Sequence, residues 1–158
     1  MTRTYGEYEV TMDAKGRIMI PAAYKKQLPE EESNGFMLTK GNRNGKCLML
    51  YTKSQWKKVE ETLDTLNDYN AEAMELKFSM MNGASPIEMD AAGRIVFSKR
   101  MIAHAGFQKD IVMLGISDCM LICDADIYEQ MGSTSDEVIK KLSEKILGEN
   151  FTKPIKVI

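Results

Sequence analysis

Alternation of apolar and polar residues predicts short strands in two similar sets along the chain. The first set runs strand, strand, short helix, strand, strand, with strands expected at residues 5–12, 17–20, 36–39 and 48–51 and the helix at 22–28. The second set repeats this order, with strands expected at residues 87–90, 95–97, 111–114 and 120–123 and a helix that ends near residue 103. A glycine-containing turn at residues 41–45 is expected to form a hairpin in the first set.

Apolar residues at helical spacing predict longer helices between and after the two sets. The first follows Thr52 or Ser54, either of which can cap it, and its apolar face carries Trp56, Val59, Leu63 and Leu66. The next, at residues 71–81, has two apolar stripes, so we expect it to be buried on two sides, between halves or between subunits. Further helices are expected at residues 125–131 and 135–147, and the tail at 151–158 is expected to be fixed only by a partner surface.

The two sets share a motif, Asp-Ala-x-Gly-Arg-Ile, which begins at Asp13 and again at Asp90. Residues 45–51 also align with residues 117–123. Because an internal repeat constrains the fold more strongly than a local pattern does, we interpret the chain as two homologous halves. The predicted domains are a first repeat at 7–55, a helical linker at 56–83, a second repeat at 84–127, and a C-terminal helix with tail at 128–158.

The Asp-x-x-Gly-Arg motif has two interpretations. Asp13 can accept backbone N–H bonds within its own turn and pair with Arg17, while Gly16 lets the backbone reverse. The motif then either staples a β-turn or also positions a guanidinium for phosphate groups or base edges, with Lys15 beside it. In the second copy Ala92 stands at the position of Lys15, so that turn is less basic at its tip.

Charge is distributed unevenly, although the net charge of the 158-residue chain is only −2. The first 28 residues are rich in Lys and Arg, and residues 124–149 are rich in Asp and Glu. There is no run of about 18 apolar residues and no apolar signal-peptide core, so we expect a soluble, cytoplasmic protein without a membrane span. Each half is too short to bury a sufficient core alone, so the halves should pack on each other, on another chain, or on both.

The residues with reactive side chains point to no catalytic site. Cys47, Cys119 and Cys123 lie in apolar strand-like stretches and are expected to be buried free thiols in a reducing compartment. The only histidine, His104, ends a helix-like run and is expected to cap it or to pack. Because the usual nucleotide, nucleophile and zinc motifs are missing from the sequence, we predict no enzyme activity, no cofactor and no metal.

Short stretches along nearly the whole chain match one family. They are Gly6-Glu7-Tyr8, Asp13-Ala14-Lys15-Gly16-Arg17 with Pro21, Leu38-Thr39-Lys40-Gly41, Gly83-Ala84, Asp90 with Gly93-Arg94, Ala105-Gly106 and Leu114-Gly115-Ile116-Ser117. On these residues the chain resembles the MraZ family of regulators of the bacterial division and cell-wall gene cluster, within the SpoVT/AbrB-like superfamily.

The resemblance implies an α+β fold. Two pseudo-symmetric SpoVT/AbrB-like halves of swapped-hairpin β-α-β type would pack as one body, with linker helices and a C-terminal helix. It also implies a homo-oligomeric ring of about eight to twelve subunits. That ring would bind direct repeats in the double-stranded promoter DNA of its own operon, act mainly as a repressor, and be associated with the nucleoid.

The resemblance assigns Arg17 as the DNA-contacting residue, with Lys15 in the same motif and Arg94 as the match in the second. Arg3 joins them as a DNA-binding candidate from the basic N-terminal region. The turn-forming residues are Asp13, Gly16, Asp90 and Gly93. The second half departs from the family pattern at Ser98, which replaces the proline of the first half, and at Asp118 and Cys123. These departures leave its contribution to DNA binding open.

Two other functions stay under consideration. One is a ring-forming protein-interaction module without DNA binding, favoured by the acidic, amphipathic C-terminal helix. The other is an antitoxin-like DNA binder of the same superfamily, which the second motif disfavours because antitoxins usually have one. A ring that aligns many Lys15 and Arg17 tips would form a basic track despite the net charge of each chain, so we favour the repressor.

Overall fold

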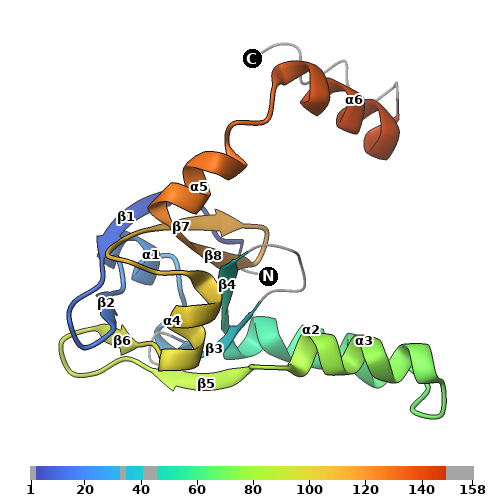
Figure 1. Cartoon of the computed structure of the whole chain (residues 1–158). Helices are drawn as coiled ribbons and strands as arrows, with labels where there is room; N and C mark the ends of the chain where they lie inside the picture. The colour runs from blue at the N-terminus through green and yellow to red at the C-terminus, as the bar shows by residue number, and fades with distance from the viewer. Residues whose placement is uncertain (1–2, 33–34, 41–45, 149–158) are drawn as a thin grey trace. The chain divides into compact units, whose positions relative to one another are not determined.

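The computed structural model describes residues 3–32, 35–40 and 46–148, and it divides into two compact units, Met1–Ala125 and Asp126–Ile158. The described chain is α+β, with a mainly antiparallel sheet and six α-helices (Figure 1). The predicted turn at 41–45 and the tail at 151–158 lie outside the described residues.

The predicted order of elements is confirmed in both halves. The first half contains β1 (Glu7–Thr11), β2 (Arg17–Met19), α1 (Ala22–Lys25), a 3₁₀ turn (Glu30–Glu32), β3 (Gly35–Thr39) and β4 (Cys47–Thr52). The second contains β5 (Ser85–Glu88), β6 (Arg94–Val96), α4 (Lys99–Ala105), β7 (Asp110–Ile116) and β8 (Cys119–Asp124). Helices α2 (Lys53–Asp64) and α3 (Ala71–Met81) connect them, and α5 (Ala125–Met131) and α6 (Asp136–Leu147) follow.

Helix α1 is shorter than the sequence predicts. It ends at Lys25 because later N–H groups donate to carbonyls only three residues earlier. Gln27 donates to the carbonyl of Tyr24, and Leu28 donates to that of Lys25. Pro29 follows, and the residue before a proline is disfavoured in helical conformation. Tyr24 is nevertheless fully buried, so this single turn anchors the segment in the core.

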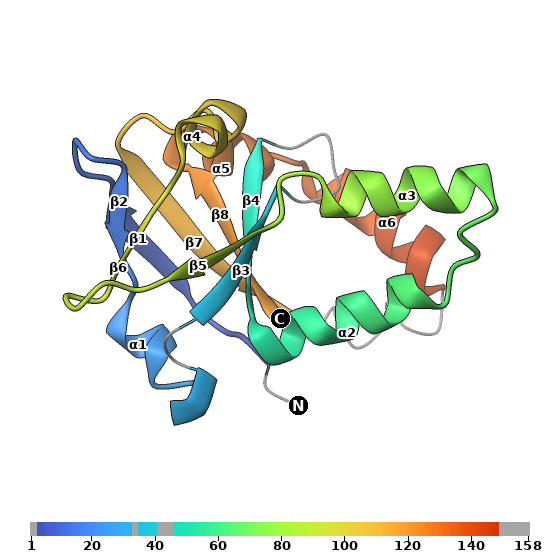
Figure 2. The same cartoon turned by 90° about the horizontal axis from the view of Figure 1, so that it is seen from below.

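Strands from both halves form one six-stranded sheet, in the order β1-β7-β8-β4-β3-β5 (Figure 2). The outer strand β1 pairs with β7 of the other half, and the outer strand β5 pairs with β3 of the other half. The two halves meet again in the middle, where β4 pairs with β8. Every one of these pairings is antiparallel, and β2 pairs with β6 in a separate two-stranded ribbon. Neither half therefore holds its outer strand by itself.

The core lies where the ribbon and α1 pack on the sheet. Ile18 and Ile95, directly paired across the ribbon, are each 1% exposed, and Tyr24 packs near Phe36 at a ring-centroid distance of 6.3 Å. Met113 and Met120 are fully buried. The other large, fully buried side chains include Ile20, Leu38, Leu48, Leu50, Ile111 and Ile122.

The helical connection confirms one prediction and corrects another. Thr52 caps α2 by a reciprocal pair of hydrogen bonds with Gln55, and Trp56 and Leu63 are buried beneath the helix. Helix α3 forms at the expected residues, but the prediction that it is buried on two sides is wrong within this chain, since none of its residues is buried and Phe78 is 70% exposed. The apolar pattern predicts which faces of α3 are favourable to bury, but no element of the described chain covers those faces.

The cysteines also depart from the prediction. Cys47 and Cys123 form a disulfide, whereas Cys119 is a buried free thiol as expected. The repeat aligns Cys47 with Cys119, but the antiparallel register of β4 and β8 places Cys47 directly opposite Cys123, with their Cα atoms 4.8 Å apart. Cross-strand neighbours at this distance suit disulfide geometry. The bond joins the two halves at the centre of the sheet.

Candidate nucleic-acid interface

The first Asp-x-x-Gly-Arg motif forms a closed turn. Oδ1 of Asp13 accepts hydrogen bonds from the backbone N–H groups of Lys15 and Arg17, both at 2.9 Å. Oδ2 of Asp13 accepts a hydrogen bond from Nε of Arg17 at 2.7 Å. The N–H of Gly16 donates to the carbonyl of Asp13 at 3.0 Å, and φ of Gly16 is +78°, a value that L side chains adopt with strain.

The second motif repeats this geometry. Oδ1 of Asp90 accepts from the backbone N–H groups of Ala92 and Arg94 at 2.9 Å, and Oδ2 accepts from Nε of Arg94 at 2.9 Å. Gly93 has φ of +85°. In both copies the aspartate thus joins the ends of the turn by hydrogen bonds. In each, the arginine binds the carboxylate through Nε, and its Nη groups make no hydrogen bond within the described residues.

The two carboxylates stay ionised at neutral pH. The pKa of Asp13 lies below its usual range, chiefly because the backbone N–H of Arg17 donates to the carboxylate, with further contributions from its side chain. The pKa of Asp90 is lowered in the same way, chiefly by the backbone N–H of Arg94. Each arginine is therefore held by a charged partner, which directs its side chain.

The β2–β6 ribbon brings the two motifs together. The N–H of Phe97 donates to the carbonyl of Gly16 at 2.8 Å, and the N–H of Ile20 donates to the carbonyl of Gly93 at 3.0 Å. The antiparallel pairing places the two turns at opposite ends of the ribbon, as Figure 2 shows with the dark blue turn before β2 and the yellow-green turn before β6.

Alternation along the ribbon separates a core face from an outer face. Ile18 and Ile95 form one directly paired position and point to the core. The residues on either side of them point outward, and these are Arg17 paired with Val96 and Arg94 paired with Met19. Met19 and Val96 are 49% and 53% exposed. We call this outer face, formed by Arg17, Met19, Arg94 and Val96, the ribbon face.

The structure places the remaining predicted residues at different sites. Lys15 is exposed at the tip of the first turn, next to the ribbon face. Arg3 is exposed but lies beyond the other end of β1, where the N–H of Thr4 donates to the carbonyl of Ser117. The length of β1 thus separates Arg3 from Asp13 and its turn.

Lys25, which the sequence pattern did not single out, lies at the second turn. A Cβ atom added to Gly93 would lie 3.0 Å from Nζ of Lys25, which comes from α1 of the first half. At the first turn the corresponding neighbour of Gly16 is Cδ1 of Ile102, also at 3.0 Å. When the alignment of the two motifs is extended into the helices that follow them, Lys25 aligns with Ile102. This alignment is the feature of the sequence that could have indicated Lys25.

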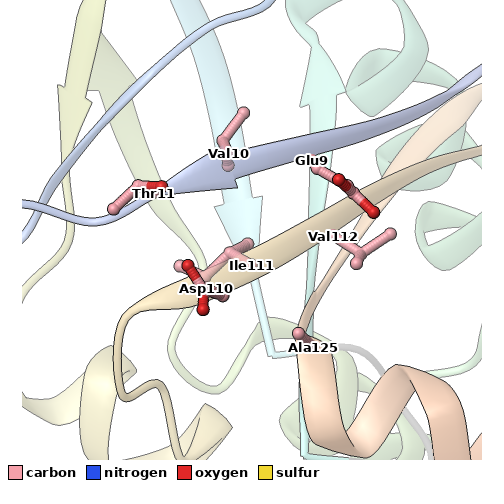
Figure 3. Close-up of a pocket in the computed structure, with 7 residues that line it drawn as sticks. All are labelled: Glu9, Val10, Thr11, Asp110, Ile111, Val112 and Ala125. Atoms are coloured by element: carbon pink, nitrogen blue, oxygen red, sulfur yellow. The ribbon is translucent and has the colours of Figure 1, made fainter.

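Outside the two turns, the described chain contains a buried histidine nitrogen and a groove lined by carboxylates. No group of three or more His, Cys, Asp or Glu side chains is arranged there to hold a metal ion. His104 lies in the last turn of α4, where its Nε2 is buried without a hydrogen-bond partner. A groove of about 440 Å³ runs along β1 and β7 (Figure 3). The carboxylates of Glu9 and Asp110 line it, which disfavours a phosphate ligand.

Comparison with known proteins identifies the family. The chain matches the model of the MraZ protein family over residues 4–78 and 80–149. The chain belongs to the MraZ family. Among its relatives, the "Transcriptional regulator MraZ" of Cytophaga hutchinsonii is 32% identical over 90% of this chain and 93% of that protein. The MraZ protein of the same description from Caldanaerobacter subterraneus subsp. tengcongensis is 34% identical over 92% of this chain and 96% of its own length.

The family match covers both turns, the whole ribbon and all of α6. None of the helices in the described ranges is both long and apolar enough to cross a lipid bilayer.

Proposed function

We propose that this chain is a transcriptional regulator that binds double-stranded DNA through the ribbon face and the two turns beside it. The observation that carries the proposal is the outward pairing of Arg17 with Val96 and of Arg94 with Met19 on a two-stranded antiparallel ribbon. The major groove of B-DNA accepts a two-stranded ribbon, and directed arginines suit phosphate oxygens or the O6 and N7 atoms of guanine. The family relatives described as transcriptional regulators support the same role.

The proposed architecture is a pair of SpoVT/AbrB-like halves of swapped-hairpin type. Exchanging the two halves turns the strand order β1-β7-β8-β4-β3-β5 into its own reverse, which supports a pseudo-twofold arrangement. The two stapled turns, whose hydrogen bonds match one for one, support it as well. In this arrangement the ribbon lies on the pseudo-twofold axis and presents one motif at each end.

The proposed target is direct repeats in the promoter of the chain's own division and cell-wall gene cluster, bound as a cytoplasmic, nucleoid-associated repressor. A ring of about eight to twelve subunits would bind it. A single chain of net charge −2 offers few phosphate contacts, so a ring that repeats the ribbon face gains affinity by effective concentration. Apolar side chains that stay exposed on α3 and α6, such as Phe78 and Ile146, support contacts between subunits.

A gel shift with the DNA upstream of the chain's own gene tests the proposal. Retardation should exceed that of competitor DNA and should weaken between about 50 and 200 mM salt. Arg17→Ala should abolish the shift without changing the oligomer. Lys57→Ala is the matched control, because Lys57 is an exposed cation on α2, outside the ribbon and its turns. An Arg17→Ala variant with the affinity of the unaltered protein would contradict the assignment.

A ring-forming interaction module without DNA binding is the second candidate. The exposed apolar residues of α3 and α6 favour it, because such faces mark protein–protein contacts. An intact oligomer by light scattering, combined with no salt-sensitive retention of DNA, would support this candidate over the regulator. Arg3→Ala in the same gel shift tests whether the basic N-terminus contributes a separate DNA contact.

A further inference from the structure

The two turns differ in where their lysine comes from. In the first turn Lys15 belongs to the motif itself, and the neighbour supplied by the other half is the apolar Ile102. In the second turn the motif has Ala92, and the neighbour supplied by the other half is Lys25. Each turn therefore has one lysine, although the sequence of the second motif shows none.

Lys25 approaches the second turn closely. Its Nζ would lie 3.0 Å from a Cβ on Gly93, and the sulfur of Met19 would lie 3.7 Å from the same point. Gly93 itself is buried. A side chain at position 93 would require the ammonium group to shift by a few tenths of an ångström. The glycine thus serves both the positive φ of the turn and the close approach of Lys25.

Lys25 is half-buried. Within the described residues no carboxylate forms an ion pair with its ammonium group. Asp90, the carboxylate of this turn, is already bound by Arg94 and by two backbone N–H groups. A half-buried cation without a paired carboxylate can take an anionic ligand as its counter-ion, and the Nη groups of Arg94 can donate to the same ligand.

We propose that Lys25 and Arg94 form a second phosphate-binding site, assembled from both halves, at the end of the ribbon opposite Lys15 and Arg17. The inference rests on the proposed function and names the class of ligand, the phosphate backbone of double-stranded DNA. Gly16 and Ile20 mark the levels of the two turns along β2 and are four residues apart. At the rise per residue of an extended strand, the two turns are therefore separated by about 13 Å along the ribbon. That separation is close to the width of the major groove, about 12 Å, so the two sites would contact the backbones on its two sides.

The test measures DNA binding by the full chain as a function of salt. Lys25→Met keeps most of the apolar stem of the side chain and removes the charge. In a plot of the logarithm of the DNA-binding constant against the logarithm of salt concentration, the slope for this variant should become less steep by about 0.9 for every chain that contacts the DNA. The affinity of the variant for specific and for non-specific DNA should fall by the same factor. Lys26→Met is the matched control, since Lys26 is the exposed neighbour and should keep the slope of the unaltered protein.

A rescue variant tests the location of the charge. Lys25→Met combined with Ala92→Lys restores a lysine to the second turn at the position that Lys15 occupies in the first, so the slope should return. If Lys25→Met lowers the melting temperature, Ala92→Glu provides a second measurement, because residue 92 is exposed and a carboxylate there should oppose phosphate binding.

The outcomes separate the two proposals. If the unaltered protein shows no salt-dependent binding to DNA, the proposed function fails. If the unaltered protein binds but Lys25→Met keeps the slope of Lys26→Met, and Ala92→Glu has no effect, the second phosphate site is overturned while the proposed function stands.

Discussion

Arg17 and Asp13 are joined by a 2.7 Å hydrogen bond from Nε to Oδ2, and the same carboxylate also accepts the backbone N–H of Arg17. The aspartate thereby fixes both the main chain and the side chain of the arginine. A structural staple and a directed guanidinium are therefore one device, and the two interpretations of the motif are not exclusive. Because only Nε is engaged, the Nη groups can donate to an external ligand.

The two turn carboxylates should make stability depend on pH in the acid range. Their pKa values are lowered in the folded chain, so their contribution is fully present above the unfolded value of about 3.9 and is lost as pH falls through the lower, folded values. The double variant Asp13→Asn/Asp90→Asn keeps an oxygen acceptor but has no titrating group. Unfolding free energies measured by denaturant at pH 7 down to about pH 2 should fall more steeply for the unaltered chain.

Identical pH profiles for the two proteins would show that neither carboxylate is stabilised by its turn. Circular dichroism at pH 7 provides the control, because both proteins should have the same strand and helix content.

Truncation should have a large effect on the buried face of the ribbon and a small effect on its exposed face. Ile95→Ala removes a side chain that is 1% exposed and should lower the unfolding free energy by about 2–5 kcal/mol. Val96→Ala, at the adjacent position on the ribbon face, should change it by no more than about 0.5 kcal/mol, because Val96 is 53% exposed. Denaturant unfolding measures both. A large loss in Val96→Ala would mean that this face is covered in the folded protein.

The disulfide between the halves predicts a specific labelling pattern. The unfolded, unreduced protein should react with iodoacetamide at Cys119 alone, and after reduction at all three cysteines of the chain. In the native state Cys119 should react slowly, because burial raises its pKa to about 11 and little thiolate forms at neutral pH. Mass spectrometry counts the labels, and three labels without reductant would contradict the pairing.

Removing that bond should also lower stability. Cys47→Ala should lower the unfolding free energy of the oxidised protein by about 2–4 kcal/mol, since the bond closes a long loop between β4 and β8. Under reducing conditions the difference in unfolding free energy between Cys47→Ala and the unaltered protein should become smaller.

Glycine is required at the first turn. In Gly16→Ala the new Cβ would lie 3.0 Å from Cδ1 of Ile102 and 3.3 Å from the carbonyl oxygen of Phe97, at a φ of +78°. The strain of the left-handed backbone alone costs about 1–2 kcal/mol, so the melting temperature should fall. Gly132→Ala is the control, because its Cβ meets nothing closer than 3.7 Å. Equal melting temperatures for both variants would contradict the strained geometry.

The order of elements and the two turns could be predicted from the sequence, because both depend on residues close together in the chain. Alternation marks a strand with one buried face, and Asp, Gly and Arg within five residues determine which hydrogen bonds a turn can form. The same local rules located α3 at its observed residues but could not decide whether its apolar faces are covered. Burial depends on what other elements lie nearby, which periodicity does not record.

Three features were decided by the tertiary structure. The register of β4 against β8 paired Cys47 with Cys123, where the repeat had aligned Cys47 with Cys119. The position of α1 brought Lys25 to Gly93, and the length of β1 kept Arg3 away from the turns. The sequence by itself determined the local devices, namely the stapled turns and the directed arginines. The contacts between the halves depend on the exchange of outer strands across one sheet. Only the tertiary structure decided them, because strand pairing requires a long-range register that neighbouring residues do not encode.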